Sequence, residues 1–341
     1  MATIKEIAET LNLSSATVSR ALRNDETLSI TAETKSKIFM TADKLGYVAK
    51  GKKMLTQNPE SNITVLHKKQ TFRNQIDSSY YFSVRTGIED ACTKHQILCN
   101  FITIDALSSY HNTADGILIV GNYSLKDFQL FTSHFPSLPM ATTGIISYYP
   151  ERIDHITHSN YDSLSMALEH LFENGHTQIG YLGVEEAPGT IQFGSRKEIF
   201  KQILVSHNCF HPEWVYESKH GKDRVERGYA TMKGWISKRQ TMPTALFCAN
   251  DPIALGALKA LNESGIRVPD DISIVAHDGS YPTQYSQPPL STIDVHPYQI
   301  GYEAVNILWE RMSGERKIAK KVSFYPELLD RQSVKNFNIN P

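Results

Sequence analysis

The chain of 341 residues has no long hydrophobic run, because no apolar stretch approaches the roughly 18 residues that a membrane-spanning helix requires. Its first residues, Met-Ala-Thr-Ile-Lys-Glu, lack the apolar region of a signal peptide, so we expect a cytoplasmic protein with no membrane partner. Cysteine is scarce: four residues and no CxxC pair argue against a disulfide framework and a zinc site. A net charge of -1 excludes a uniformly basic nucleic-acid coat and an acidic disordered tail.

The common catalytic motifs are also missing. The sequence contains no GxxxxGKS or GxxxxGKT phosphate loop, no HExxH, no GxSxG elbow and no GxGxxG after a predicted strand. His207 and His211 flank Cys209 and could share one helix face, but next to Pro212 we favour a helix-end pair over a metal site. We therefore expect no enzymatic activity, no metal and no cofactor.

The positive charge that the chain does carry is concentrated near its N-terminus. Residues 1–56 hold nine Lys or Arg against six Asp or Glu, a net charge of +3, so the remainder carries -4. A polyanion would therefore meet the N-terminal part. The segment from Gln57 to Asn62 is polar, contains a proline and breaks helical periodicity, which predicts a linker before a large domain that begins at Ile63.

Beyond the linker, short apolar segments rich in β-branched residues alternate with segments of helical period. This alternation predicts a mostly parallel sheet covered on both faces. About a dozen strands are more than one such sheet usually holds. We therefore expect two doubly wound subdomains that share a ligand cleft at the carboxyl ends of their strands. Among the predicted strands are 63–66, 97–104, 116–120, 179–182, 244–248 and 272–276, and helices are predicted at 81–94, 162–174, 196–206, 228–237, 253–264 and 297–312.

The first sixty residues predict three short helices. Residues 3–6 form a capping box for a helix that ends near Asn12, and Ser14 can cap a second helix at once. A third helix is expected to start at Thr31 and to bury Ile38. Two short helices joined by a turn of about three residues and backed by a third predict a helix-turn-helix unit. A small helical bundle used for protein contacts is the alternative.

The second helix carries the side chains suited to DNA. Ser15, Ala16 and Arg20 should face outward, and Arg20 can offer a bidentate fork to a guanine. Thr17 and Ser19 suit phosphate oxygens.

A basic segment follows the third predicted helix. Lys50, Lys52 and Lys53 precede Met54 and Leu55, which combines cations for phosphates with apolar side chains that could wedge between base steps. The alternative is a solvated charge run in front of a flexible linker.

These residues closely resemble the DNA-binding domain of the LacI/GalR family of bacterial transcription regulators. The similar segments are IKEIA at 4–8, LSSATVSRAL at 13–22 and KLGY at 44–47. The resemblance continues through nearly the whole chain at DGILI (115–119), EHL (169–171), GH (175–176), ANDPIALG (249–256), VPDDISIV (268–275) and PPLSTI (288–293). Within the family, residues 77–81 and 183–189 are most similar to the repressor of the evolved β-galactosidase and to galactose operon repressors.

The resemblance implies an N-terminal all-α helix-turn-helix domain and an α/β core like that of periplasmic binding proteins, built from two doubly wound parallel-sheet subdomains. The implied divisions are a DNA-binding domain at 1–47, a hinge and linker at 48–62, an N-terminal core subdomain at 63–159 plus about 294–320, and a C-terminal core subdomain at 160–293 plus about 321–331. Leu55 matches the hinge leucine that opens the minor groove of the operator.

The resemblance also implies an effector pocket between the subdomains. Its polar side chains would suit the paired hydroxyls of a sugar, each of which donates and accepts. An aromatic side chain would supply a flat apolar face. The matching polar residues are Asp162, Arg196, Asn250 and Asp278, and the candidate aromatic residues are Tyr81 and Phe193.

We therefore expect a homodimeric transcriptional repressor that binds operator DNA and is released by a small sugar, galactose or a galactoside. Two alternatives stand beside this hypothesis. A sugar-binding receptor without DNA function would share the cleft, but it should carry an export signal and lack residues 3–47. A global carbon-catabolite regulator of the same family, with a phosphorylated carrier protein as corepressor, would share nearly all of these motifs.

Overall fold

The computed structural model describes the chain in two units, residues 1–59 and residues 60–341, and each is considered by itself. The described residues are 3–22, 30, 34, 37–38, 41, 61–72, 74, 76–110, 113–144, 152–184, 195–218, 221–238 and 241–338.

The first unit is helical. Helix α1 spans Ile4–Leu11 and helix α2 spans Ser15–Leu22. Residues 34, 37, 38 and 41 are helical as well, within the range predicted for the third helix. The buried side chains of this unit come from all three segments, which confirms that the third packs behind the first two: Ile7, Ala8, Val18, Ala21 and Ile38.

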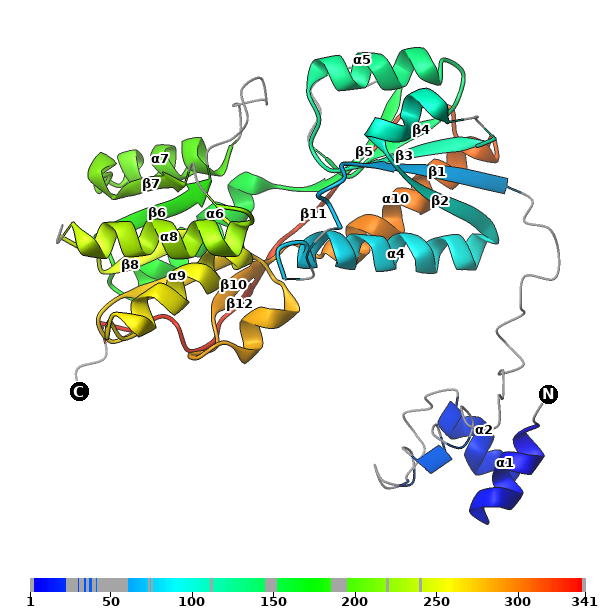
Figure 1. Cartoon of the computed structure of the whole chain (residues 1–341), viewed down its shortest axis with the longest axis horizontal. Coiled ribbons are helices and arrows are strands. Elements are labelled where there is room, and N and C mark those ends of the chain that lie inside the picture. The colour runs from blue at the N-terminus through cyan, green and yellow to red at the C-terminus, as the bar shows by residue number, and fades with distance from the viewer. Residues whose placement is uncertain are drawn as a thin grey trace. The chain divides into compact units, whose positions relative to one another are not determined.

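The second unit contains two six-stranded sheets, each covered by helices (Figure 1). The first sheet has the strand order β11-β5-β4-β3-β1-β2, and all of its neighbours are parallel. Its strands are β1 (Ser61–His67), β2 (Ile97–Thr103), β3 (Gly116–Val120), β4 (Met140–Thr142), β5 (Ile153–His158) and β11 (Lys321–Phe324). The helices of this subdomain are α4 (Ser79–His95), α5 (Leu125–His134) and α10 (Pro297–Met312), with a 3-10 helix η1 (Ile104–Ser109).

The second sheet has the order β12-β10-β9-β8-β6-β7, and only the β10–β12 pair is antiparallel. Its strands are β6 (Ile179–Val184), β7 (Val215–Ser218), β8 (Ala245–Cys248), β9 (Ser273–Asp278), β10 (Ser291–Asp294) and β12 (Glu327–Leu329). Its helices are α6 (Asn160–Glu173), α7 (Arg196–Ser206), α8 (Arg224–Ser237) and α9 (Asp251–Glu263), with 3-10 helices η2 (Pro212–Trp214) and η3 (Tyr281–Tyr285). The predicted fold class is thus confirmed.

One boundary of the sequence-based division is wrong. Residues 321–331 were assigned to the second subdomain, but β11 pairs with β5 of the first sheet, and only β12 joins the second. Two hydrogen bonds to Lys320 hold β11 beside β5. The buried Asp154 carboxylate accepts the Lys320 N–H at 2.7 Å, and the His155 N–H donates to the Lys320 carbonyl at 2.8 Å. The chain therefore passes between the subdomains three times, after β5, after β10 and between β11 and β12.

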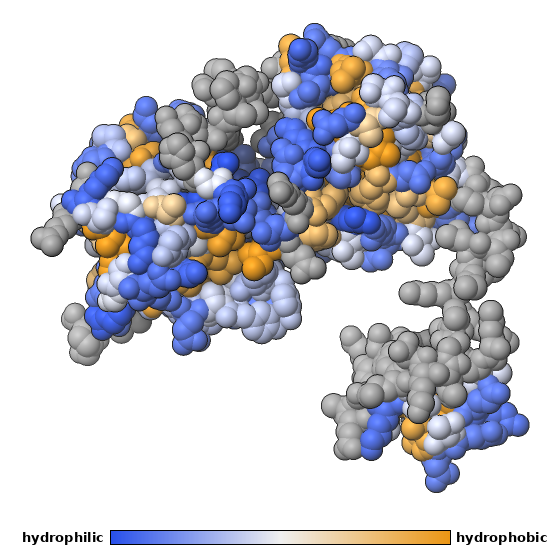
Figure 2. Space-filling model, viewed as in Figure 1, coloured by the Kyte–Doolittle hydropathy of each residue, from blue (hydrophilic) through white to orange (hydrophobic). Residues whose placement is uncertain are grey.

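One apolar cluster surrounds the second sheet, and two apolar clusters pack against the first. Hydrophilic side chains cover most of the face seen in Figure 2, and apolar residues appear there only in small patches. Among the residues that the structure describes, no helix is both long and apolar enough to cross a membrane.

Helices α4 and α10 approach each other through two glycines, which gives a stability prediction. A Cβ on Gly301 would lie 2.0 Å from the Val84 carbonyl oxygen, and one on Gly87 would lie 2.0 Å from that of Tyr298. The backbone of a packed helix cannot move aside as a flexible side chain can. Gly301→Ala should therefore lower the free energy of unfolding by about 1–3 kcal/mol. Urea denaturation of the full chain measures this loss.

Gly234 provides the matched control for that experiment. It also lies within a helix, α8, but a Cβ there would meet nothing within 4 Å. Gly234→Ala should therefore raise the free energy of unfolding by about 0.5–1 kcal/mol through helix propensity alone. If Gly301→Ala does not lower the free energy of unfolding, and instead behaves like Gly234→Ala, then α4 and α10 are not in close contact.

Candidate DNA-binding and effector sites

The first candidate site is the turn between α1 and α2. The Thr3 hydroxyl accepts the Glu6 N–H at 3.3 Å and the Glu6 carboxylate accepts the Thr3 N–H at 2.6 Å, which confirms the predicted capping box. Asn12 ends α1 in the left-handed region, with φ of 53°, and its N–H donates to the last carbonyls of the helix. The Ser14 hydroxyl then accepts the Thr17 N–H at 3.0 Å and starts α2. Only three residues separate the two helices, as a helix-turn-helix requires.

The first residues of α2 are exposed. Val18 and Ala21 are buried in the core of the first unit, whereas Ser15 and Ala16 are exposed. Ser15 and Ala16 are thus available to another molecule. Thr17, Ser19 and Arg20 are partly buried, and the Thr17 hydroxyl lies 2.8 Å from that of Ser14. The other predicted DNA-binding residues, Lys50, Lys53 and Leu55, lie outside the described residues.

The second candidate site lies at the carboxyl ends of strands in the second unit. Strand β5 ends at His158, β9 ends at Asp278, and Asn250 follows β8. Arg196 is the first residue of α7. Because parallel strands end at one edge of a sheet, side chains that are distant in the sequence meet there.

Asp278 is the centre of this second site. Its Oδ1 lies 3.6 Å from Nη2 of Arg196 and 2.9 Å from Nδ1 of His277, so a guanidinium and an imidazole N–H both point at one carboxylate. Asp278 has a φ of 115°, a conformation that L-residues rarely adopt. Such backbone strain is typical of functional sites.

Three buried nitrogen atoms around this carboxylate have no hydrogen-bond partner among the described residues. They are Nε of Arg196, Nε2 of His277 and Nδ1 of His158. The His158 and His277 rings lie 5.3 Å apart, centroid to centroid. Buried polar atoms almost always have a partner in folded proteins, and an unsatisfied one is costly. A polar ligand that bonds to these nitrogens would satisfy them.

Burial sets the protonation of this cluster. It lowers the pKa of His158 to about 3 and that of His277 well below 6.5, with Arg196 contributing to both shifts, so both rings are neutral at pH 7. Burial also raises the pKa of Asp278, against the attraction of Arg196. Behind it, burial and the Asp278 charge raise the pKa of Asp251, whose carboxylate accepts the Thr292 hydroxyl at 2.6 Å. The cluster therefore carries little net charge and many hydrogen-bonding groups.

Another ion pair lies beside this cluster and, unlike Arg196–Asp278, joins the two subdomains. Asp77 precedes α4 of the first subdomain, and Arg224 begins α8 of the second. The Arg224 N–H donates to Oδ1 of Asp77 at 2.7 Å, and its Nη1 donates to Oδ2 at 3.3 Å. Tyr80 packs against the apolar cores of both subdomains. These contacts join the two subdomains beside the site.

The structure brings three of the predicted effector residues together. Arg196 and Asp278 form the ion pair described above, and Tyr81 lies close enough that both charges act on its phenol, whose pKa is raised chiefly by burial. The Tyr81 ring packs edge-on against that of Tyr80 at 5.1 Å, centroid to centroid. A partly buried aromatic ring therefore borders the polar cluster.

The remaining predicted effector residues differ in their placement. Asn250 is buried, and its Oδ1 accepts the Ile253 N–H at 3.0 Å as the cap of α9, which leaves its amide nitrogen for a ligand. Asp162 lies in the first turn of α6, and no contact among the described residues joins its carboxylate to Arg196 or Asp278. Phe193 lies outside the described residues.

Both parts of the chain match known families. A profile of "Bacterial regulatory proteins, lacI family" matches residues 3–50, and one of a "Periplasmic binding protein-like domain" matches residues 168–334. The transcriptional repressor MelR of Bacillus subtilis (strain 168) is 31% identical to this chain, and the match covers 98% of this chain and 97% of MelR. The chain belongs to the LacI family.

Other members of the LacI family match with similar coverage. The transcriptional regulator GalR of Streptococcus thermophilus is 29% identical over 98% of this chain and 100% of its own. Two solved structures share the fold over 98% of this chain. The CelR–cellobiose complex has a TM-score of 0.71 at 19% identity, and the match covers 100% of that chain. The lac repressor dimer bound to operator and the anti-inducer ONPF has a TM-score of 0.69 at 21% identity, and the match covers 99% of that chain. This LacI-family protein is therefore a DNA-binding transcriptional repressor, and its relatives named here are regulators, not enzymes.

Sequence reasoning missed four residues of the site in this LacI-family protein. His277 stands directly before Asp278 and His158 ends the strand before the first chain crossing, so a search for polar residues at strand ends would have found both. Asp77 and Arg224 offered no such signal, because their pairing joins residues almost 150 positions apart.

The two buried histidines of the repressor predict a pH dependence of its stability. The pKa of His158 is about 3 in the folded chain against 6.5 ordinarily, so protons bind the unfolded chain first as the pH falls. Stability is then lost between about pH 6.5 and pH 3, by about 2 kcal/mol for this group at pH 5. Urea denaturation at pH 7 and pH 5 should show a smaller acid loss in His158→Phe than in the wild type. Equal losses would mean that His158 is protonated in the folded protein.

Proposed function

We propose that this repressor binds its operator as a homodimer and is released when an unphosphorylated sugar, galactose or a galactoside, binds the cluster around Asp278. The observation that carries the proposal is the convergence of Arg196 and His277 on the Asp278 carboxylate, with the His158 ring beside that of His277 and three buried nitrogens that have no partner among the described residues.

The polarity of the cluster favours a neutral polyol. A sugar hydroxyl both donates and accepts, so it can donate to the unprotonated nitrogens of His158 and His277 and to the Asp278 carboxylate, and accept from Nε of Arg196. The ring of Tyr81 would cover the apolar face of the sugar. Asn250, Asp162 and Phe193 complete the proposed set of contacts.

The ion pairs favour an unphosphorylated sugar. Arg196 faces Asp278 and Arg224 faces Asp77, so each cation of the cluster already has its carboxylate. A phosphate dianion entering here would have to displace one of these carboxylates or lie beside it, and like charges at such distances repel strongly. The resemblance to galactose regulators supports galactose within this class, and the cellobiose bound to CelR supports a sugar in this fold.

The DNA-binding part of the proposal rests on α2. Ser15, Ala16 and Arg20 would contact bases, Thr17 and Ser19 would contact phosphates, and Lys50, Lys53 and Leu55 would act at the hinge. Direct base contacts specify the sequence, whereas the lysines bind any DNA.

Calorimetric titration of the full chain tests the ligand class. Galactose or lactose should bind with one site per chain, and Arg196→Ala should weaken that binding, whereas sorbitol, an open-chain polyol, should bind poorly. If neither sugar binds but a phosphorylated carrier protein raises operator affinity, the catabolite-regulator alternative replaces this proposal.

A further inference from the structure

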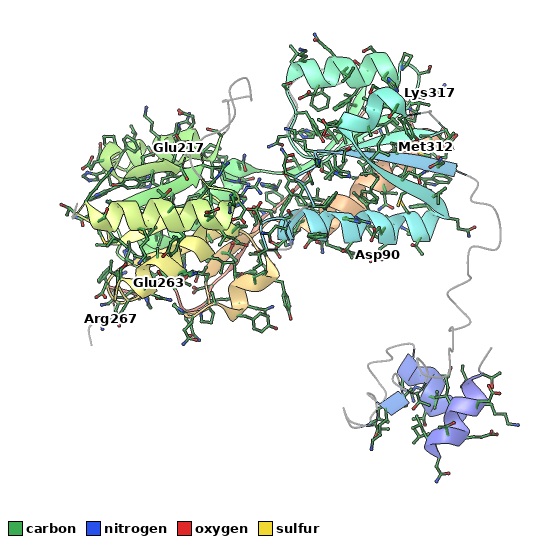
Figure 3. The ribbon with its side chains drawn as sticks, viewed as in Figure 1. Asp90, Glu217, Glu263, Arg267, Met312 and Lys317 are labelled. Atoms are coloured by element: carbon green, nitrogen blue, oxygen red, sulfur yellow. The ribbon has the colours of Figure 1, made fainter. Side chains whose placement is uncertain are left out.

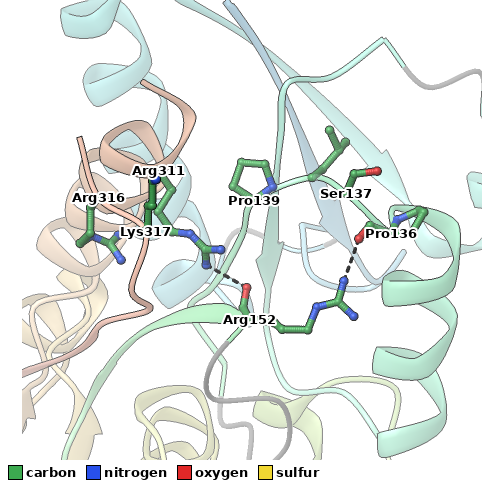
Figure 4. Close-up of a pocket in the computed structure, with 8 residues that line it drawn as sticks. Pro136, Ser137, Pro139, Arg152, Arg311, Arg316 and Lys317 are labelled. Atoms are coloured by element: carbon green, nitrogen blue, oxygen red, sulfur yellow. Dashed lines mark hydrogen bonds between the residues drawn. The ribbon is translucent and has the colours of Figure 1, made fainter. Parts of the chain in front are cut away.

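A cavity lies in the first subdomain. Its volume is about 380 Å³, and its walls are the 136–139 segment and four cationic residues, Arg152, Arg311, Arg316 and Lys317 (Figure 4). These cations come from three places in the chain: the residue before β5, the last turn of α10 and the loop that follows α10.

This cavity is remote from the cluster around Asp278. Residue 139 directly precedes β4 and Arg152 directly precedes β5, so the cavity lies where these strands begin. The effector cluster lies where β5 ends, six residues further on at His158, a separation of roughly 20 Å along the strand. Figure 3 places Lys317 and Met312 at the outer end of the first subdomain, away from the second. Two ligands could therefore bind the two sites at once.

The charge of Arg316 is compensated. Arg316 donates to both oxygens of the buried Asp154 carboxylate, at 2.8 and 3.0 Å, and to Glu310 at 2.7 Å. Lys320 donates to the same Glu310 oxygen at 2.7 Å. The Asp154 and Glu310 carboxylates thus fix Arg316 in place and compensate its charge.

The other three cations of the cavity are not compensated in this way. Arg152 donates to the Pro136 carbonyl at 2.7 Å, and Arg311 donates to the Arg152 carbonyl at 2.8 Å (Figure 4). Arg311 lies 3.8 Å from an oxygen of Asp154, but that carboxylate is already shared between Arg316 and the Lys320 N–H. In the described parts of the chain, no carboxylate pairs with Arg152 or Lys317.

We propose that this cavity is a second binding site, for a small molecule that carries a phosphate group. Arg152 and Arg311 each retain N–H donors for the planar, bidentate contacts that guanidinium makes with phosphate, and Lys317 adds a third positive charge. A phosphate dianion would neutralise these positive charges, whereas a neutral sugar would not. The cavity has room for the rest of a sugar phosphate, since pockets for small ligands begin at about 300 Å³. This site is independent of the proposed sugar response.

Calorimetric titration of the full chain with glucose 6-phosphate, inorganic phosphate and glucose tests the proposal. Glucose 6-phosphate should bind, and glucose should not bind at this cavity. The variant Lys317→Gln, which removes no described contact, should weaken glucose 6-phosphate binding at least fivefold, and the double variant Arg152→Gln/Lys317→Gln should weaken it at least tenfold. Lys126→Gln, at an exposed position of α5, is the matched control and should leave the binding unchanged.

The outcomes separate the possible ligands. Tighter binding of glucose 6-phosphate than of inorganic phosphate assigns the cavity to a phosphorylated metabolite, and equal binding assigns it to phosphate itself. Either result supports the site if Lys317→Gln weakens the binding. The proposal is overturned if neither compound binds at 10 mM, or if both pocket variants bind like Lys126→Gln. Because these variants leave the Asp278 cluster intact, they should still bind galactose, so failure here does not count against the proposed sugar response.

Discussion

Replacing Asp278 by glycine should give a repressor that remains on its operator at galactose concentrations that release the wild type. The carboxylate that Arg196 and His277 share would be lost, while glycine adopts the φ of 115° without strain, so the fold should survive. Leaving these buried donors without their acceptor should cost about 1–3 kcal/mol of ligand affinity, or roughly 5- to 150-fold. Operator release, followed by fluorescence anisotropy during galactose titration, measures the shift.

Arg196→Ala should have the same effect from the other side of the ion pair. Arg267→Ala is the matched control, because Arg267 also pairs with a carboxylate of its own subdomain, Asp271, but on the exposed surface. The control should respond to galactose like the wild type. If the Asp278→Gly and Arg196→Ala proteins are folded and dimeric and also respond to galactose like the wild type, neither residue contacts the effector. The assignment of the effector site then fails.

Replacing Arg20 by alanine should remove most of the preference for operator over scrambled DNA. If Arg20 forks onto a guanine in each half-site, each lost contact should cost about 1–3 kcal/mol at that base pair, and a dimer loses two. The operator can be obtained by selecting bound sequences from random DNA with the wild-type protein. Competition between this operator and scrambled DNA at one fixed salt concentration measures the preference.

The control for Arg20 is Lys5→Ala. Lys5 is an exposed cation on α1 and pairs only loosely with Glu9, at 3.9 Å. If it contributes to DNA binding at all, its loss should weaken operator and scrambled DNA alike, because phosphate contacts do not depend on sequence. An Arg20→Ala protein that keeps the wild-type preference would show that Arg20 does not contact bases.

The parts of the fold that local signals determine could be predicted from the sequence. The capping box at Thr3 and the cap at Ser14 involve neighbours within three residues, and the structure shows both. The strands and helices of the core follow from periodicity within each segment. Strand β11 shows the limit, because its sheet is decided by Asp154, more than 160 residues away in the chain.

The candidate sites could be predicted only in part, for the same reason. Arg196 and Asp278 were found through resemblance to a family, whereas His158, His277 and the Asp77–Arg224 pair belong to the site only because of folding. The basic cavity was even harder to predict. Arg152 and Lys317 belong to no motif in the sequence, and they meet only where β5 and the loop after α10 come together. Neither burial nor the lack of a carboxylate partner can be read from the residues themselves.

The most direct test of the sugar response is the affinity of the full-length wild-type protein for its selected operator, measured with and without galactose or lactose. The account predicts that at least one of these sugars lowers operator affinity at least tenfold, whereas sorbitol does not. Operator affinity that neither sugar changes, in a protein that is folded and binds its operator, would contradict the account.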